Sequence, residues 1–284
     1  MCFSLSSAWI SKLFNRSGGC SGGASSGEHD FDLGKILGRS GVVESADDRA
    51  QIAAMLQEEA KDLARGLPHP GEVERFAHRV EAVQKMTSGE LKTLFDPAFL
   101  QRSYPAFQFG GRFGSAASSC AAFAVEALRK GLCRCIGFNF QGFDTHAANY
   151  RAHPAALQEL FNLVFALVTT LDNTPHPASP ARKLSDSTHI FVMSEFCRTP
   201  QINQAAGRDH YPNNSALLIS PRLRAPALMG GTDPDQLLPM PISGFAAGAR
   251  AITPADVLST LTAAVGVDPK PHFRDGEVLR ALLR

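Results

Sequence analysis

The residues that decide the predicted fold run from Arg134 to Met193, in the order strand, helix, strand. RCIGFNF at 134–140 and THIFVM at 188–193 are short apolar runs typical of strands. Between them, residues 155–171 repeat apolar side chains at helical spacing, in a helix that Pro154 is expected to begin. Apolar strands that alternate with long helices belong to a sheet covered on both faces. The order therefore predicts an α/β fold with a mostly parallel sheet flanked by helices.

Three further elements extend this pattern on either side. Ser115–Lys130 is an Ala-rich helix that Gly131 closes at its C-terminus. Ser215–Ser220 is another short strand. The stretch TPAD at 253–256 starts a helix by two signals, a Thr cap with Asp at the third helical position and Pro at the first. That last helix is expected to end at Gly266.

The first thirty residues differ in composition from the rest. Residues 1–30 are predicted to be a disordered tail with a Gly/Ser linker at 17–27. Lys12 and Arg16 follow the apolar part of the tail, whereas a signal peptide begins with its basic residues, so no convincing signal peptide is present and the cytoplasm is the default location. Residues 31–284 are predicted to form a single α/β domain, helical over 31–100 and carrying the motifs over 101–284.

Composition excludes several classes of protein. The 284 residues contain 28 Lys and Arg against 27 Asp and Glu, a net charge of +1, which argues against a nucleic-acid binder with a broad basic surface. The longest strongly apolar stretch, Leu160–Leu171, is far shorter than the about 20 residues of a bilayer span, so no membrane span is expected. The six cysteines lack Cys-x-x-Cys spacing, which disfavours a zinc ribbon.

The first polar cluster is GFDTH at 142–146, which follows the strand predicted at 134–140. Asp144 and His146 are two residues apart, so in an extended chain their side chains point to one side, where they could bind one metal ion together. Ligands of open α/β sheets bind beyond the C-terminal ends of strands, which is where this cluster is predicted to lie. The alternative is a loop Asp that caps the next helix beside an exposed His.

The second cluster is SEFCRT at 194–199, directly after the strand predicted at 188–193. Glu195 at a buried strand end is costly unless it is paired or binds a metal. Either Glu195 pairs with Arg198, or Glu195 binds a metal and Arg198 faces an anionic substrate.

The third cluster is GRDHYP at 207–212, just before the strand predicted at 215–220. Asp209 and His210 are adjacent, an arrangement in which one binds a metal and the other binds or orients a ligand. The alternative is a simple turn.

Together with Asn203, the three motifs closely resemble one bacterial family, the domain of unknown function 1501, a sulfatase-like branch of the alkaline phosphatase superfamily. The family's pattern is approximately Gly-Trp-Asp-Thr-His, then Ser-Glu-Phe-Gly-Arg-Thr-Pro, then Asn, then Gly-x-Asp-His. This chain has Phe143 for the Trp and Cys197 for the Gly. The resemblance covers roughly Ser103 to the end, in the same order and at approximately the same spacing.

The resemblance implies a site with one or two divalent metals, of which Zn, Mn, Ca and Mg are the candidates. It makes Asp144, His146, Glu195, Asp209 and His210 the expected ligands. Arg198 is expected to neutralise the anionic oxygens of an ester substrate through its fork of donors. Thr145 and Ser194 lie beside the expected ligands, but neither is equipped as a nucleophile, so the nucleophile is unknown.

One part of the family pattern has no counterpart in this chain. The resemblance implies that family members are longer chains. Their N-terminal part supplies a Gly-rich strand-turn, further acidic ligands and a Ser or Thr nucleophile. The expectation is therefore an N-terminally truncated sulfatase-like fold. Two functions stay open: a metal-dependent hydrolase of sulfate or phosphate esters, or a non-catalytic remnant or accessory module that keeps part of the metal site. The truncated fold also leads us to expect a partner chain that completes it.

Overall fold

The computed structural model describes Gln51, Ala54, Met55, Glu58, Leu94 and residues 96–284. The described chain forms two compact units: one holds residues 139–175 and 180–284, and the other holds the described residues up to 138 together with 176–179. The predicted tail and linker at 1–30 lie outside the described residues. So does most of the predicted helical part at 31–100. Within it the structure describes four helical positions, Gln51, Ala54, Met55 and Glu58, and also Leu94 and residues 96–100.

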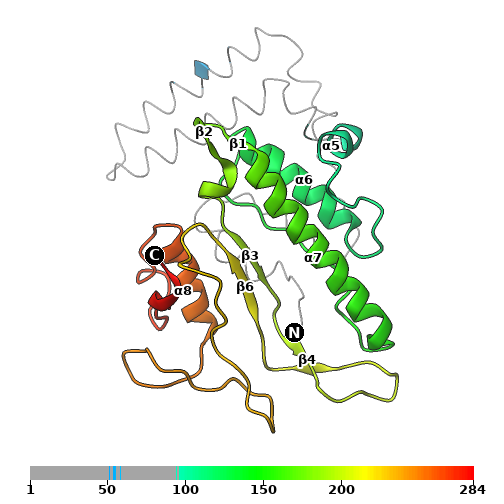
Figure 1. The fold of residues 1–284 in the computed structure, drawn as a ribbon, viewed down its shortest axis with the longest axis vertical. Coiled ribbons are helices and arrows are strands. Elements are labelled where there is room, and N and C mark those ends of the chain that lie inside the picture. Colours follow the sequence, from blue (N-terminus) through cyan, green and yellow to red (C-terminus); the bar gives the residue numbers. More distant parts are fainter. Residues whose placement is uncertain (1–50, 52–53, 56–57, 59–93, 95) are drawn as a thin grey trace. The chain divides into compact units, whose positions relative to one another are not determined.

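The unit that holds the described residues up to 138 contains two packed helices, α5 (Pro97–Ser103) and α6 (Ser115–Arg129) (Figure 1). Helix α5 starts at a Pro, and the carboxylate of Asp96 caps it by accepting the Ala98 N–H at 2.9 Å. Helix α6 confirms the helix predicted at 115–130. It ends just before Gly131, which has a φ of 65° that suits glycine.

A buried carboxylate ties these two helices together. Glu126 is 1% exposed and receives hydrogen bonds from Arg129 at 2.6 and 2.9 Å. The Tyr104 hydroxyl, which follows α5, donates to the same carboxylate. Burial by itself raises the pKa of Glu126, but these hydrogen bonds outweigh it and hold the pKa below its usual range. The Glu126–Arg129 ion pair lies within α6, and the hydrogen bond from Tyr104 to the same carboxylate links this helix to the end of α5.

Helix α7 (Asn149–Asn173) is longer than the predicted 155–171 because it starts six residues earlier. Its first turn is held by tertiary contacts, since the Asn149 N–H donates to the Ala206 carbonyl at 2.9 Å. Pro154 therefore lies inside the helix instead of starting it. α7 is long and apolar enough to cross a membrane by length and composition, with a mean hydropathy of 1.4, a test that core helices of soluble proteins also pass. The predicted lack of a membrane span stays a prediction.

The described strands form three two-stranded sheets. β1 (Pro175–His176) pairs with β2 (Ser179–Lys183), β3 (Ile190–Met193) with β6 (Ala216–Ile219), and β4 (Cys197–Arg198) with β5 (His210–Tyr211). β3 and β6 confirm the strands predicted near 188–193 and 215–220, and lie side by side in Figure 1. A short helical turn, η2 (Leu184–Ser187), precedes β3.

Two parts of the predicted sheet are not seen in the described residues. Residues 134–140, predicted as a strand, form no strand in the described part of the chain. The pairs β3–β6 and β4–β5 are antiparallel, and no parallel pair occurs among the described strands. The mixed helix-and-strand class is confirmed, while the mostly parallel arrangement is not seen in the described residues. Apolar strands alone do not fix which neighbours pair with them.

Helix α8 (Pro254–Ala264) confirms the helix predicted from residues 253–266, including its Thr253 cap and its end before Gly266, at a φ of 82°. A short turn, η3 (Arg280–Leu282), lies near the C-terminus. Asp256, in the first turn of α8, is 0% exposed and accepts five hydrogen bonds. They come from Arg250 at 2.7 and 2.8 Å, from the N–H and hydroxyl of Thr253 at 2.7 Å, and from the Glu277 N–H at 2.8 Å.

Candidate metal centre

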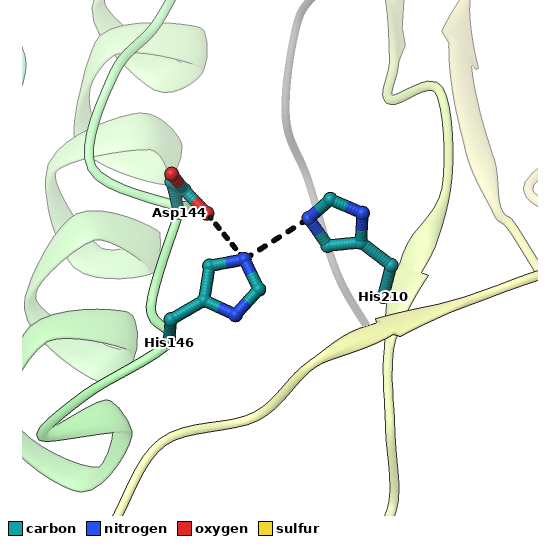
Figure 2. A group of neighbouring side chains, drawn as sticks. All are labelled: Asp144, His146 and His210. Carbon is teal, nitrogen blue, oxygen red and sulfur yellow. Dashed lines mark hydrogen bonds and ion pairs between the residues drawn. The ribbon is translucent and has the colours of Figure 1, made fainter. Parts of the chain in front are cut away.

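Three predicted ligands come together at one point of the structure. Asp144 and His146 lie in the loop that leads into α7, and His210 is the first residue of β5 (Figure 2). The Nε2 atom of His146 lies 3.1 Å from Nε2 of His210 and 3.3 Å from Oδ1 of Asp144. One ligand atom from each of the three side chains lies within 4.8 Å of the others, and all three residues are exposed.

These distances fit a shared divalent cation. A tetrahedral zinc ion holds nitrogen and oxygen ligands at about 2.0–2.1 Å, which places neighbouring ligand atoms about 3.3–3.4 Å apart. The separations of 3.1 and 3.3 Å around His146 are close to that edge length. Two imidazoles and one carboxylate also match a common ligand set of zinc sites that keep one position open. Asp144, His146 and His210 could therefore hold a metal, whose identity the geometry leaves open.

Asp209 lies on the other side of the His146 ring from this point. Its Oδ1 is 2.8 Å from Nδ1 of His146. Because a carboxylate only accepts, Nδ1 carries the proton in this hydrogen bond, which leaves Nε2, the atom near Asp144 and His210, as the one that a cation would bind. The hydrogen bond from His146, followed by one from Asn203, holds the pKa of Asp209 below its usual range. The structure thus places Asp209, predicted as a ligand, as the carboxylate that orients a ligand.

Arg198 lies next to the same group, because β4 pairs it directly with His210 on β5. Its side chain is 6% exposed and donates to Oδ1 of Asp144 at 2.6 Å and to the Arg208 carbonyl at 3.1 Å. This hydrogen bond is the main reason that the pKa of Asp144 is below its usual range. Arg198, predicted to face an anionic substrate, therefore borders the candidate metal point while it contacts one of the ligands.

Glu195 is the predicted ligand that the structure does not bring into the group. The preceding residue, Ser194, is fully buried, with its hydroxyl hydrogen-bonded to the Phe196 carbonyl and to Asn214. Glu195 is exposed, and its carboxylate is not one of the three grouped ligand atoms. The chain leaves β3 with Ser194 directed inward, so Ser194 takes the buried position predicted for Glu195.

The two hydroxyls next to the predicted ligands are both buried. Thr145 is 3% exposed, and its Oγ1 accepts a hydrogen bond from Asn149 at 2.6 Å. Ser194 is 0% exposed and engaged as described above. Neither hydroxyl is presented at the surface where Asp144, His146 and His210 meet, so the nucleophile stays unassigned.

Phe196 is a site residue that the sequence analysis did not single out. Its ring lies 4.0 Å from the His210 ring, centroid to centroid, at an interplanar angle of 30°. The Arg198 guanidinium lies 5.6 Å from the centre of the same ring. Phe196 therefore supports both neighbours at once. The signal in the sequence is its spacing, because residues two apart in an extended segment, such as 196 and 198, share a face.

The fold and the grouped side chains define a mixed helix-and-strand protein with a candidate metal site where the loop before α7 meets β5. The chain belongs to the family described as Protein of unknown function (DUF1501), which it matches over residues 44–277. The match starts well before Ser103, where the resemblance was expected to begin. No curated protein and no solved structure matches the chain.

Proposed function

We propose that this protein is a metal-dependent hydrolase of sulfate or phosphate esters. The observation that carries the proposal is the convergence of Asp144, His146 and His210 at separations that suit one cation. A divalent cation at this point polarises an ester oxygen and lowers the pKa of a bound water molecule. The three side chains are exposed, so a substrate can reach the point where they meet.

The residues around the ligands have separate roles in this proposal. Asp209 fixes the protonation of His146 on Nδ1 and so keeps Nε2 available for the cation. Arg198 supplies a positive charge beside the ester's anionic oxygens. Because the net charge of the chain is only +1, an anionic substrate would be attracted by a bound metal ion together with Arg198 and not by the protein as a whole.

The finer expectations from the family resemblance belong to the same proposal. They are a sulfatase-like fold of the alkaline phosphatase superfamily, a chain that corresponds to the C-terminal portion of that fold, and a partner chain that supplies the rest. The apolar strand β3 (Ile190–Met193) supports the first of these expectations, a fold built on a sheet. A strand that is apolar at every position is typical of the middle of a sheet.

A non-catalytic metal-binding module is the second candidate. The burial of Thr145 and Ser194 favours it, since the two hydroxyls nearest the ligands in sequence are directed away from the surface. In this case the three-ligand site serves binding or stability without turnover.

Metal content and turnover separate the two candidates. The purified protein is analysed for bound metal and then assayed with aryl sulfates and aryl phosphates in the presence of Zn, Mn, Ca or Mg. Asp144→Ala and His210→Ala are expected to lose the metal and the turnover together. The control is His272→Ala, an exposed histidine outside the group.

Each outcome decides between the candidates. Metal binding with turnover that both alanine variants abolish supports the hydrolase. Metal binding without turnover on either ester class supports the non-catalytic module. A protein that binds none of the four metals contradicts both.

A further inference from the structure

The side chain of Asn203 uses its whole hydrogen-bonding capacity at the edge of the candidate metal centre. Its Nδ2 donates to the His146 carbonyl at 3.0 Å and to Oδ1 of Asp209 at 3.1 Å. Its Oδ1 accepts from the N–H groups of Ala205 at 3.0 Å and Gly207 at 2.9 Å. A carboxamide offers two donors and two acceptor lone pairs, so this side chain is fully engaged.

The four bonds join two segments that are far apart in the sequence. One segment carries His146, and the other is the turn that leads to Asp209 and His210. The Asn203 N–H also donates to the Gly207 carbonyl at 2.9 Å, so both the backbone and the side chain of Asn203 hold this turn. The carboxamide thus contacts the backbone of one ligand residue and the carboxylate that orients its ring.

The approach of the two segments is unusually close at Gly207. A Cβ atom built on Gly207 would lie 1.9 Å from the carbonyl oxygen of His146 and 2.4 Å from the nitrogen of Ala147. Because only glycine lacks a Cβ, no other residue fits this position without moving the backbone. The same approach allows the Arg208 N–H to donate to the Thr145 carbonyl at 2.9 Å.

We propose that Asn203 is a positioning residue that fixes His146 against Asp209, so that Nε2 of His146 faces Asp144 and His210 before any metal binds. This inference rests on the proposed metal site and adds a residue to it. Asn203 acts through Asp209 and the His146 backbone. The role requires an amide, because one end must donate to two oxygens while the other end accepts from two N–H groups.

Asn203→Asp is the sharpest test, since it keeps the size and the acceptor end and replaces only the donor. The new oxygen would face the His146 carbonyl and the Asp209 carboxylate, two acceptors that now lie 3.0 and 3.1 Å away. The matched control is Asn213→Asp, which also removes a donor to a backbone carbonyl, that of Leu237 at 2.7 Å. Asn203→Ala, which adds no charge, serves if the Asp variant does not fold.

Two readouts are measured on each protein. Calorimetric titration with Zn²⁺ alone is expected to show binding about 10–100-fold weaker in Asn203→Asp than in the wild-type protein and in Asn213→Asp. Nitrogen-detected NMR of the metal-free histidines is expected to show His146 protonated on Nδ1 in the wild type and as a mixture of tautomers in Asn203→Asp. A loss of general stability would not move this second readout.

The outcomes separate this inference from the proposed function. Unchanged Zn²⁺ affinity together with an unchanged His146 tautomer in Asn203→Asp overturns the role of Asn203. A wild-type protein that binds no Zn²⁺ contradicts a zinc site, while the tautomer comparison still decides whether Asn203 positions the ring.

Discussion

The substitution Gly207→Ala is expected to separate the two segments that form the candidate metal centre. The added Cβ would lie 1.9 Å from the His146 carbonyl oxygen, whereas even a tight carbon–oxygen contact needs roughly 3 Å. The obstacle is backbone, which cannot turn aside as a side chain can. The segments therefore have to move apart by about 1 Å, which the close packing of the chain resists.

Several hydrogen bonds span the gap that would open, and three of those to backbone carbonyls are 3.0 Å or shorter. They are the bonds from the Arg208 N–H to the Thr145 carbonyl at 2.9 Å, from the Asn149 N–H to the Ala206 carbonyl at 2.9 Å, and from the Asn203 side chain to the His146 carbonyl at 3.0 Å. At about 1 kcal/mol of net stability for each bond, their loss lowers the free energy of unfolding by about 3 kcal/mol. For a protein of this size the midpoint of thermal unfolding should fall by about 6–12 °C.

The assay compares Gly207→Ala with Gly231→Ala by thermal unfolding and by Zn²⁺ titration. Gly231 has no atom within 4 Å of an added Cβ, so its substitution should change the free energy of unfolding by less than about 0.5 kcal/mol. Gly207→Ala should lose both stability and Zn²⁺ affinity. If the two variants unfold at the same temperature and bind Zn²⁺ equally, the close approach at Gly207 does not hold the site together.

Two other predictions concern the α8 carboxylate and the aromatic support of His210. Asp256→Asn should lower the free energy of unfolding, measured in urea, by about 2–3 kcal/mol, because it replaces one acceptor oxygen with an NH2 donor that faces other donors. The exposed Asp235→Asn should leave it unchanged. Burial raises the pKa of Asp256, but its hydrogen bonds, first that from Arg250, hold the pKa well below the ordinary value. The wild type should therefore lose stability as the pH falls below about 4. Asp256→Asn should flatten this acid limb of the curve of stability against pH. Phe196→Ala should weaken Zn²⁺ binding without large unfolding. Phe165→Ala, at a residue that is 74% exposed, should leave Zn²⁺ binding unchanged.

Each of these has a contradicting result. An acid limb that is equally steep in wild type and Asp256→Asn would show that other carboxylates govern acid unfolding. Equal Zn²⁺ affinity in the Phe196 and Phe165 variants would show that stacking does not orient His210.

Local signals predicted several helices correctly. The Thr253 cap and Gly266 mark the ends of α8, and Gly131 marks the end of α6, because caps and left-handed glycines act within one turn of the chain. The predicted start of α7, at residue 155, is six residues later than the observed start at Asn149, because Pro154 resembles a first-turn proline. The true start depends on a hydrogen bond from Asn149 to Ala206, more than fifty residues away in the sequence.

The candidate site shows the same division. The sequence by itself determined the kinds of side chain, two histidines and several carboxylates placed after apolar segments, and the resemblance to the family that the chain belongs to. The tertiary structure decided which of them meet: Asp144, His146 and His210 converge, Asp209 orients His146, and Glu195 faces solvent.

The physical reason lies in how far each interaction reaches. Caps, turns and apolar periodicity are set by neighbours a few residues apart, so they can be read from the sequence. Strand pairing and the convergence of ligands depend on contacts between distant segments, here the approach of Gly207 to the His146 backbone and the bridge that Asn203 makes between them. No local pattern in either segment encodes the other, so only the folded chain decides whether they form one site.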